Sequence, residues 1–108
     1  MKSFGDLVKQ AQKMQKQMTD VQAALDDERF ESSAGGGLVT AIVDGRQRLK
    51  ELRIKPEAMA EKDVTLLEDV LMTAIGEAQR QSEAHMKEAL GKVFHDNGIV
   101  IISGLIFG

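Results

Sequence analysis

The feature that most constrains the fold is a long apolar seam between Phe4 and Leu25. Apolar residues recur there at alternating steps of three and four for three heptads, namely Phe4, Leu7, Ala11, Met14, Met18, Val21 and Leu25. This spacing is typical of a helix that buries a narrow seam against a partner helix. It predicts a long helix that begins after Ser3 as N-cap, with Asp6 completing a capping box, and ends near residues 26–28.

Four lysines lie on the opposite side of this predicted helix, because successive residues are about 100° apart around a helix. They are Lys2, Lys9, Lys13 and Lys16. The helix would then offer a dry face to a partner and a basic face to an anion. The alternative is that the lysines only solvate an exposed face, as charged residues do on many amphipathic helices.

The middle of the chain predicts three antiparallel strands. Residues 38–43 are β-branched and apolar on both faces, as expected for a central strand. Gly35 to Gly37 predict a turn before this strand, and Asp44-Gly45 predict a hairpin after it. The other two strands are expected at residues 28–34 and 47–54, which together make a three-stranded meander.

The return strand is expected to contain a bulge. Leu49 is out of phase with Leu52 and Ile54, so an extra residue is predicted near Lys50 and Glu51. Pro56 then ends the strand, because proline lacks the backbone N–H that a sheet requires.

A second long helix follows a predicted helical turn at residues 57–60. Asp63 is its expected N-cap, and its seam turns small and polar after Ala78. We therefore expect the helix to pack on the sheet at its start, to project later, and to fray near Val93. One domain is expected at residues 1–95. For the strongly apolar tail at residues 96–108, a packed segment, a strand and disorder stay open.

Composition excludes several classes of function. The chain has no cysteine, which rules out disulfides and thiolate zinc sites. His85 and His95 belong to no metal-ligand or catalytic pattern, and no phosphate-binding or dinucleotide motif is present. The sequence predicts neither a signal peptide nor a membrane-spanning segment. We expect a cytoplasmic protein that is not an enzyme and has no cofactor, metal site, catalytic residue or small-molecule substrate.

The net charge of −3 hides separate basic and acidic blocks. Residues 1–19 hold four lysines against one aspartate, which gives +3. Residues 46–55 hold Arg46, Arg48, Lys50, Arg53 and Lys55 against Glu51, which gives +4. The distribution of charge decides binding to a polyanion more than the sum does. The two basic blocks therefore indicate an anionic partner despite the acidic total.

Six short motifs, in order and spacing, resemble a known family over about residues 4–92. They are Met14 to Met18, Ala34 to Val39, Asp44-Gly45, Leu52 to Pro56, Leu66 to Asp69 and Met86 to Lys92. The chain thereby resembles the YbaB/EbfC family of bacterial nucleoid-associated DNA-binding proteins. The apolar run from Ile99 to Ile102 departs from the short, flexible, Gly/Pro-rich end that is usual in this family.

The resemblance implies an α+β protomer in a tweezer-like homodimer that binds double-stranded DNA in the nucleoid with little sequence preference. It also implies roles in nucleoid organisation and gene expression. Basic residues of the two helices are implicated in DNA contact in this family. With the basic return strand added, the candidate DNA-binding residues are Lys9, Lys13, Lys16, Arg46, Arg48, Arg80 and Lys87.

A second hypothesis is a protein–protein adaptor that uses its helix seam for a partner and does not bind DNA. The acidic total favours this adaptor, whereas the two basic blocks favour DNA. The sequence specifies neither a DNA target nor the regulated genes.

Overall fold

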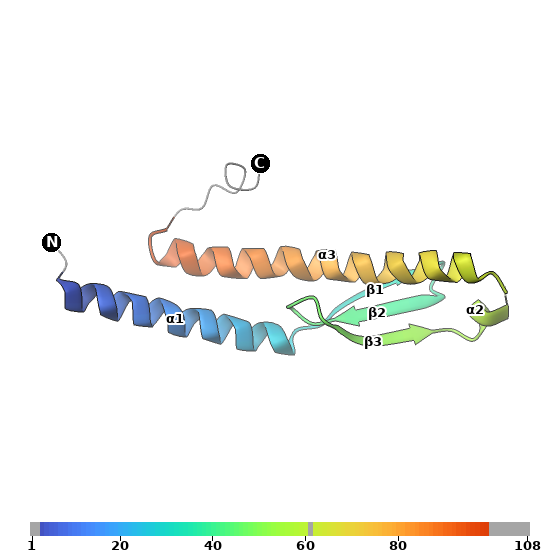
Figure 1. The fold of residues 1–108 in the computed structure, drawn as a ribbon, viewed down its shortest axis with the longest axis horizontal. Helices are drawn as coiled ribbons and strands as arrows, with labels where there is room; N and C mark the ends of the chain where they lie inside the picture. Colours follow the sequence, from blue (N-terminus) through green and yellow to red (C-terminus); the bar gives the residue numbers. More distant parts are fainter. Residues whose placement is uncertain (1–2, 61, 100–108) are drawn as a thin grey trace.

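A computed structural model describes residues 3–60 and 62–99, which form an elongated molecule of 69 × 30 × 16 Å (Figure 1). The elements are α1 (Phe4–Asp27), β1 (Phe30–Ala34), β2 (Val39–Val43), β3 (Leu49–Ile54), α2 (Glu57–Ala60) and α3 (Val64–Asp96). The predicted α+β class is confirmed: a long N-terminal helix, a three-stranded antiparallel sheet and a long C-terminal helix.

Both long helices begin at the predicted caps. The Asp6 backbone N–H donates to the Ser3 side chain, and the Ser3 backbone N–H donates to the Asp6 carboxylate, which completes the capping box. The Asp63 carboxylate accepts from the Leu66 backbone N–H at 3.0 Å. These side chains satisfy N–H groups that have no partner within the helix.

The expected fraying of α3 near Val93 is not observed, because the helix continues to Asp96. The Asn97 side-chain amide donates to the Val93 carbonyl and to the Gln17 side chain of α1, each at 2.7 Å. These two bonds hold the end of α3 against the middle of α1, which the sequence of α3 alone does not reveal.

The strands pair in the order β1-β2-β3, and both pairs are antiparallel. The predicted bulge is confirmed: Ile42 pairs with Glu51 and Val43 with Leu49, so Lys50 is the extra residue. Gly35, at φ 66°, opens a turn of three glycines with positive φ. β3 begins at Leu49 rather than Gln47, because the Asp44 carboxylate binds the backbone N–H groups of residues 46 and 48 and holds them in the loop.

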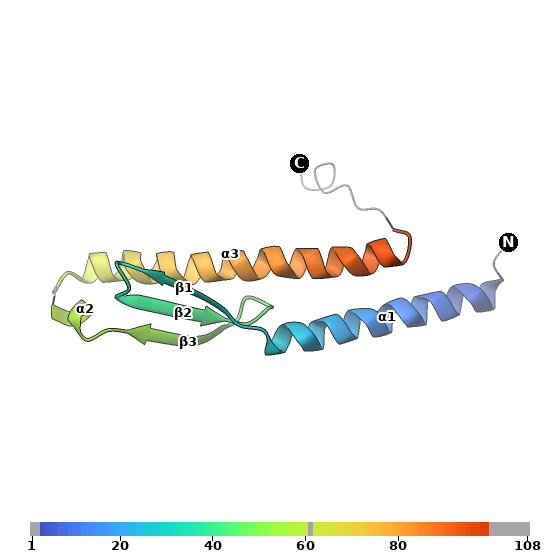
Figure 2. The same ribbon diagram turned by 180° about the vertical axis from the view of Figure 1, so that it is seen from behind.

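The core lies between α3 and one face of the sheet. Val39, Ala41 and Val43 of β2 pack against Ala74 and Ala78 of α3, and all five are fully buried. α3 contacts β1 and β2, whereas β3 lies farthest from it (Figures 1 and 2). Within the described part of the chain, no helix covers the opposite face of the sheet.

The apolar residues of β3 are left partly exposed on the α3 side of the sheet. Leu49, Leu52 and Ile54 pair with the buried residues of β2 and therefore point to the same face. Their exposed fractions are nevertheless 45%, 38% and 41%. We call these three residues the β3 row.

α1 forms an arm that projects away from the sheet, antiparallel to the second half of α3 (Figures 1 and 2). The seam is buried only at its C-terminal end, where Leu25 is 2% exposed. Phe4 and Leu7 are exposed, because the N-terminal end of the arm extends past α3. In the single chain the seam is therefore buried only near Leu25, and its burial against a partner helix stays a prediction.

The hairpin loop contacts the C-terminal end of α1 at Gly45. We call this end of the helix the root of the arm. The Gly45 N–H donates to the Leu25 carbonyl at 2.8 Å, and a Cβ on residue 45 would lie 2.6 Å from that oxygen. Gly45 is thus required by the close approach of two backbones. The loop and the arm form one rigid junction at this point.

Replacing Gly45 by alanine should lower the free energy of unfolding by about 1–3 kcal/mol, because the new methyl group forces the loop away from α1. Gly91→Ala is the matched control, since nothing lies within 4 Å of that position in α3. It should raise the free energy of unfolding by about 0.5–1 kcal/mol. Urea unfolding followed by circular dichroism measures both. Equal stability of Gly45→Ala and wild type would contradict the tight junction.

The predicted apolar tail, residues 96–108, lies mostly outside the described residues, which end at Ile99. Within the described part of the chain, no helix has the length and apolar character needed to cross a membrane.

Candidate nucleic-acid interface

The lysines of the arm are exposed, but they differ in their surroundings. The Lys16 ammonium is 3.1 Å from the Asp20 carboxylate one turn later. Lys9 and Lys13 form no ion pair with a carboxylate of the described residues. Among the described lysines of the arm stripe, these two therefore have no carboxylate partner.

The hairpin arginines face carboxylates from two elements. Arg48 contacts the Asp26 and Asp44 carboxylates at 2.7 Å each, and Arg46 is 3.5 Å from Asp26. Asp26 lies at the end of α1, so these ion pairs join the hairpin to the root of the arm. Both arginines keep about half of their side chains exposed.

Asp44 is the fully buried centre of this junction. Burial alone would raise the pKa of its carboxyl, but hydrogen bonds from the backbone and guanidinium of Arg48 and from the backbone of Arg46 leave this pKa below its ordinary value of 3.8. The hydrogen bond between the Arg48 guanidinium and the Asp44 carboxylate in turn raises the pKa of Arg48. The Asp44 carbonyl accepts from the buried Ser82 hydroxyl of α3 at 2.6 Å. Asp44 thereby links the hairpin to α3.

The candidate cations of α3 are paired within their own helix. The Arg80 guanidinium is 2.7 Å from the Glu77 carboxylate, and the Lys87 ammonium is 3.1 Å from Glu83. The bond from Arg80 lowers the pKa of Glu77. The structure therefore distributes the seven predicted residues over the arm, the hairpin and α3 and does not gather them in one patch.

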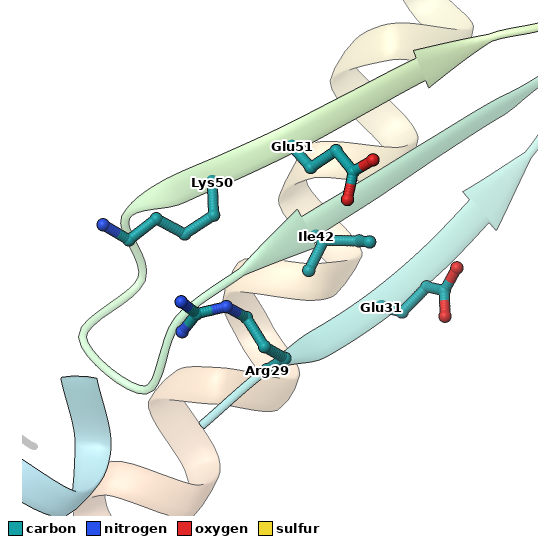
Figure 3. Close-up of a pocket in the computed structure, with 5 residues that line it drawn as sticks. All are labelled: Arg29, Glu31, Ile42, Lys50 and Glu51. Atoms are coloured by element: carbon teal, nitrogen blue, oxygen red, sulfur yellow. The ribbon is translucent and has the colours of Figure 1, made fainter. Parts of the chain in front are cut away.

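Arg29 was not among the predicted residues, although the structure gives it a distinctive position. It lies two residues after the end of α1, and its guanidinium donates to the backbone carbonyls of Asp26 and Glu28 at 2.8 Å each. Figure 3 draws it beside Lys50 in a hollow on the open face of the sheet. The available sequence signal was an arginine immediately after a helix end, where a cation meets the negative end of the helix dipole.

His85 has structural partners. Its Nε2 lies 2.6 Å from the Glu28 carboxylate, and its ring lies 5.3 Å from the Phe30 ring. Among the described residues, no three histidine, aspartate or glutamate side chains are arranged to hold a metal ion.

Comparison with known proteins identifies a family. The family model described as the YbaB/EbfC DNA-binding family matches residues 1–97. A nucleoid-associated protein of Alkaliphilus metalliredigens is 42% identical over 91 residues, which cover 84% of this chain and 80% of that protein. A nucleoid-associated protein of Clostridium acetobutylicum is 38% identical over 103 residues, 95% of this chain and 89% of the relative.

A solved structure has the same fold. It is the crystal structure of an uncharacterized protein from Helicobacter pylori, which superposes with a TM-score of 0.81. The alignment covers 87% of this chain and 99% of the other, at 21% sequence identity. At that identity the likeness concerns the fold alone.

Proposed function

This chain belongs to the YbaB/EbfC DNA-binding family and is a nucleoid-associated DNA-binding protein, and we propose that it binds double-stranded DNA as a homodimer with little preference for sequence. The arm supplies the first phosphate contacts. Through such binding the protein organises the nucleoid of the bacterial cytoplasm and affects gene expression. The names of the relatives give no support to the adaptor alternative.

The observation that carries the proposal is the uncompensated charge on the projecting arm. Lys9 and Lys13 are exposed, lie one turn apart, and form no ion pair with a carboxylate of the described residues. A DNA phosphate can approach them without displacing a protein partner. Each lysine that neutralises a phosphate releases condensed counterions, and this release drives sequence-independent binding.

The candidate cations that pair with carboxylates contribute to DNA binding by exchanging these partners for phosphates. Lys16, Arg80 and Lys87 each contact a carboxylate within their own helix, at 2.7–3.1 Å. Exposed ion pairs of this kind are worth only about 0–1 kcal/mol, so a phosphate competes with them readily. Arg46 and Arg48 are held more firmly, since they also tie the hairpin to the arm.

The β3 row supports the homodimer. Leu49, Leu52 and Ile54 form an apolar strip on an edge strand, next to the helix that covers the other two strands. Exposed apolar edge strands invite pairing or coverage by another chain. A second copy that covers this row would double the number of arms, and DNA would then meet two sets of lysines.

Neutralising the arm should reduce both affinity and salt dependence. In Lys9→Gln/Lys13→Gln, a dimer loses four lysines, so the slope of log K against log salt should become shallower by up to about 3.6 at about 0.9 per phosphate. Fluorescence anisotropy with random duplex DNA at several salt concentrations measures the slope. Folding should be unchanged, because both side chains are exposed.

The control is Lys55→Gln/Lys62→Gln, which removes the same charge at the opposite end of the molecule, beside α2. It should change the slope much less than the arm variant does. Equal effects of the two variants would mean that net charge, and not the arm, governs binding. Absence of DNA binding by the wild type near 50 mM salt would overturn the proposed function.

A further inference from the structure

The open face of the sheet contains a hollow of about 490 Å³ that the predicted DNA-binding set does not use. Arg29, Glu31, Ile42, Lys50 and Glu51 line it (Figure 3). Arg29 and Lys50 lie together at the hairpin end, Ile42 lies between the two ends, and both carboxylates point away from the cations. The hollow is therefore divided into a basic end and an acidic end.

Both carboxylates of the acidic end contact a third cation, Arg53. The Glu51 carboxylate accepts from the Arg53 guanidinium at 2.8 and 3.1 Å, and the Glu31 carboxylate is 3.9 Å from the same group. The hydrogen bond from Arg53 lowers the pKa of Glu51, so this carboxylate stays ionised beside the arginine. Neither carboxylate is paired with Arg29 or Lys50.

The basic end is not neutralised. Arg29 is held by two backbone carbonyls, and neither Arg29 nor Lys50 forms an ion pair with a carboxylate of the described residues. Both hydrogen bonds to the carbonyls come from one guanidinium nitrogen, Nη1. The N–H groups of Nε and Nη2 therefore stay available to a ligand. Arg29 is thus a positioned cation with free donors.

The bulge in β3 brings Lys50 to the same place. Leu49 lies on the α3 face and Glu51 on the open face, so Lys50 is an inserted residue between two regular positions. A bulge redirects side chains at a strand edge. Here both Lys50 and Glu51 line the open-face hollow, and Lys50 lies beside Arg29.

We propose that Arg29 and Lys50 form a phosphate-binding site at the root of the arm, which takes a phosphodiester group of bound duplex DNA. This inference rests on the proposed function and adds a contact on the sheet to the contacts on the arm. Lys13 and the end of α1 at Asp27 are about 21 Å apart at 1.5 Å per residue. The two sites therefore contact different phosphates, and their effects on binding should add.

The test is the salt dependence of binding to random duplex DNA by Lys50→Gln and by Arg29→Gln/Lys50→Gln. The Lys50 side chain is exposed and forms no hydrogen bond with a described residue, so its replacement tests the site without altering the fold. In a dimer the slope should become shallower by up to about 1.8 in the single variant and about 3.6 in the double variant. Affinity near 0.1 M salt should fall at least about tenfold in the double variant.

Arg29→Lys separates binding from helix capping. It keeps the charge, so the salt slope should stay close to that of the wild type even if the lost carbonyl bonds lower the unfolding temperature. Wild-type slopes in both Lys50→Gln and the double variant, with the wild type still binding DNA, would overturn this site alone. If the salt slope of the double variant became shallower only as much as that of the distant Lys55→Gln/Lys62→Gln control, the site would also be overturned. A wild type that does not bind DNA would instead refute the proposed function.

Discussion

Replacing Asp44 by alanine is expected to lower the free energy of unfolding by about 3 kcal/mol. The Asp44 side chain is fully buried and accepts hydrogen bonds from the backbone N–H groups of Arg46 and Arg48, at 2.8 and 3.0 Å. Each buried donor that loses its acceptor costs about 1–3 kcal/mol. Arg48 loses one of its two carboxylate partners but keeps Asp26 at 2.7 Å, and half of its side chain is exposed to water.

Two further variants give this prediction its controls. Asp44→Asn keeps an oxygen for the backbone N–H groups but loses the charge, so its effect should lie between those of alanine and wild type. Asp27→Ala removes an exposed carboxylate from the end of α1 and should change stability by less than about 0.5 kcal/mol. Urea unfolding measures all three. An effect of Asp44→Ala no larger than that of Asp27→Ala would contradict the structural role of the junction.

The same carboxylate sets a pH dependence. The pKa of Asp44 is lowered in the folded state, so the folded protein binds this proton less readily than the unfolded chain does. The stabilisation is therefore complete above the unfolded value of 3.8 and is lost as the pH falls through the lower, folded pKa. The stability difference between wild type and Asp44→Asn should accordingly shrink below about pH 4.

Local features of the fold could be predicted from the sequence because their causes are local. The Ser3–Asp6 capping box, the Asp63 cap and the glycine turn each depend on residues within three or four positions. The bulge at Lys50 was also predictable, since the phase of apolar residues changes within one strand. In each case a short segment contains both the signal and the group that satisfies it.

Features that depend on distant partners could not be predicted. Ser82 donates to the Asp44 carbonyl across 38 positions, and the end of α3 is fixed by a hydrogen bond from the Asn97 side chain to Gln17 across 80. The seam of α1 indicated burial, but a linear pattern does not specify how far the partner helix extends. Leu7 therefore satisfies the heptad pattern and is still exposed in the single chain.

In the candidate site, too, some features follow from the local sequence and others depend on distant partners. The exposure of Lys9 and Lys13 followed from the helical period, because they lie opposite the seam. The pairing of Arg46 and Arg48 with Asp26 joins the basic block to an acidic block that the sequence places 20 and 22 positions earlier. Arg29 is held by the carbonyls of residues 26 and 28, but Lys50 comes to lie beside it only when the sheet forms. Net charge along the sequence thus locates cations without indicating which of them stay free for DNA.

Replacing two residues of the β3 row should dissociate the proposed homodimer. In Leu52→Gln/Ile54→Thr, a dimer loses four partly exposed apolar side chains from its interface, at 38% and 41% exposure in the single chain. Full burial of such a side chain is worth about 1.5–3 kcal/mol, so burying the exposed fractions contributes about 2–5 kcal/mol in total. The dissociation constant should rise by about thirtyfold to several thousandfold, at tenfold for each 1.4 kcal/mol.

Analytical ultracentrifugation at several protein concentrations measures this constant, and Leu7→Gln/Val8→Thr is the matched control. Leu7 and Val8 are exposed to a similar extent, 52% and 39%, but they lie on the arm. At concentrations where only the β3 variant is monomeric, the slope of log K against log salt should fall to about half, because a monomer carries half of the phosphate contacts. Dissociation by the arm control alone would move the interface to the helix seam. A wild type that sediments as a monomer at micromolar concentration would overturn the homodimer.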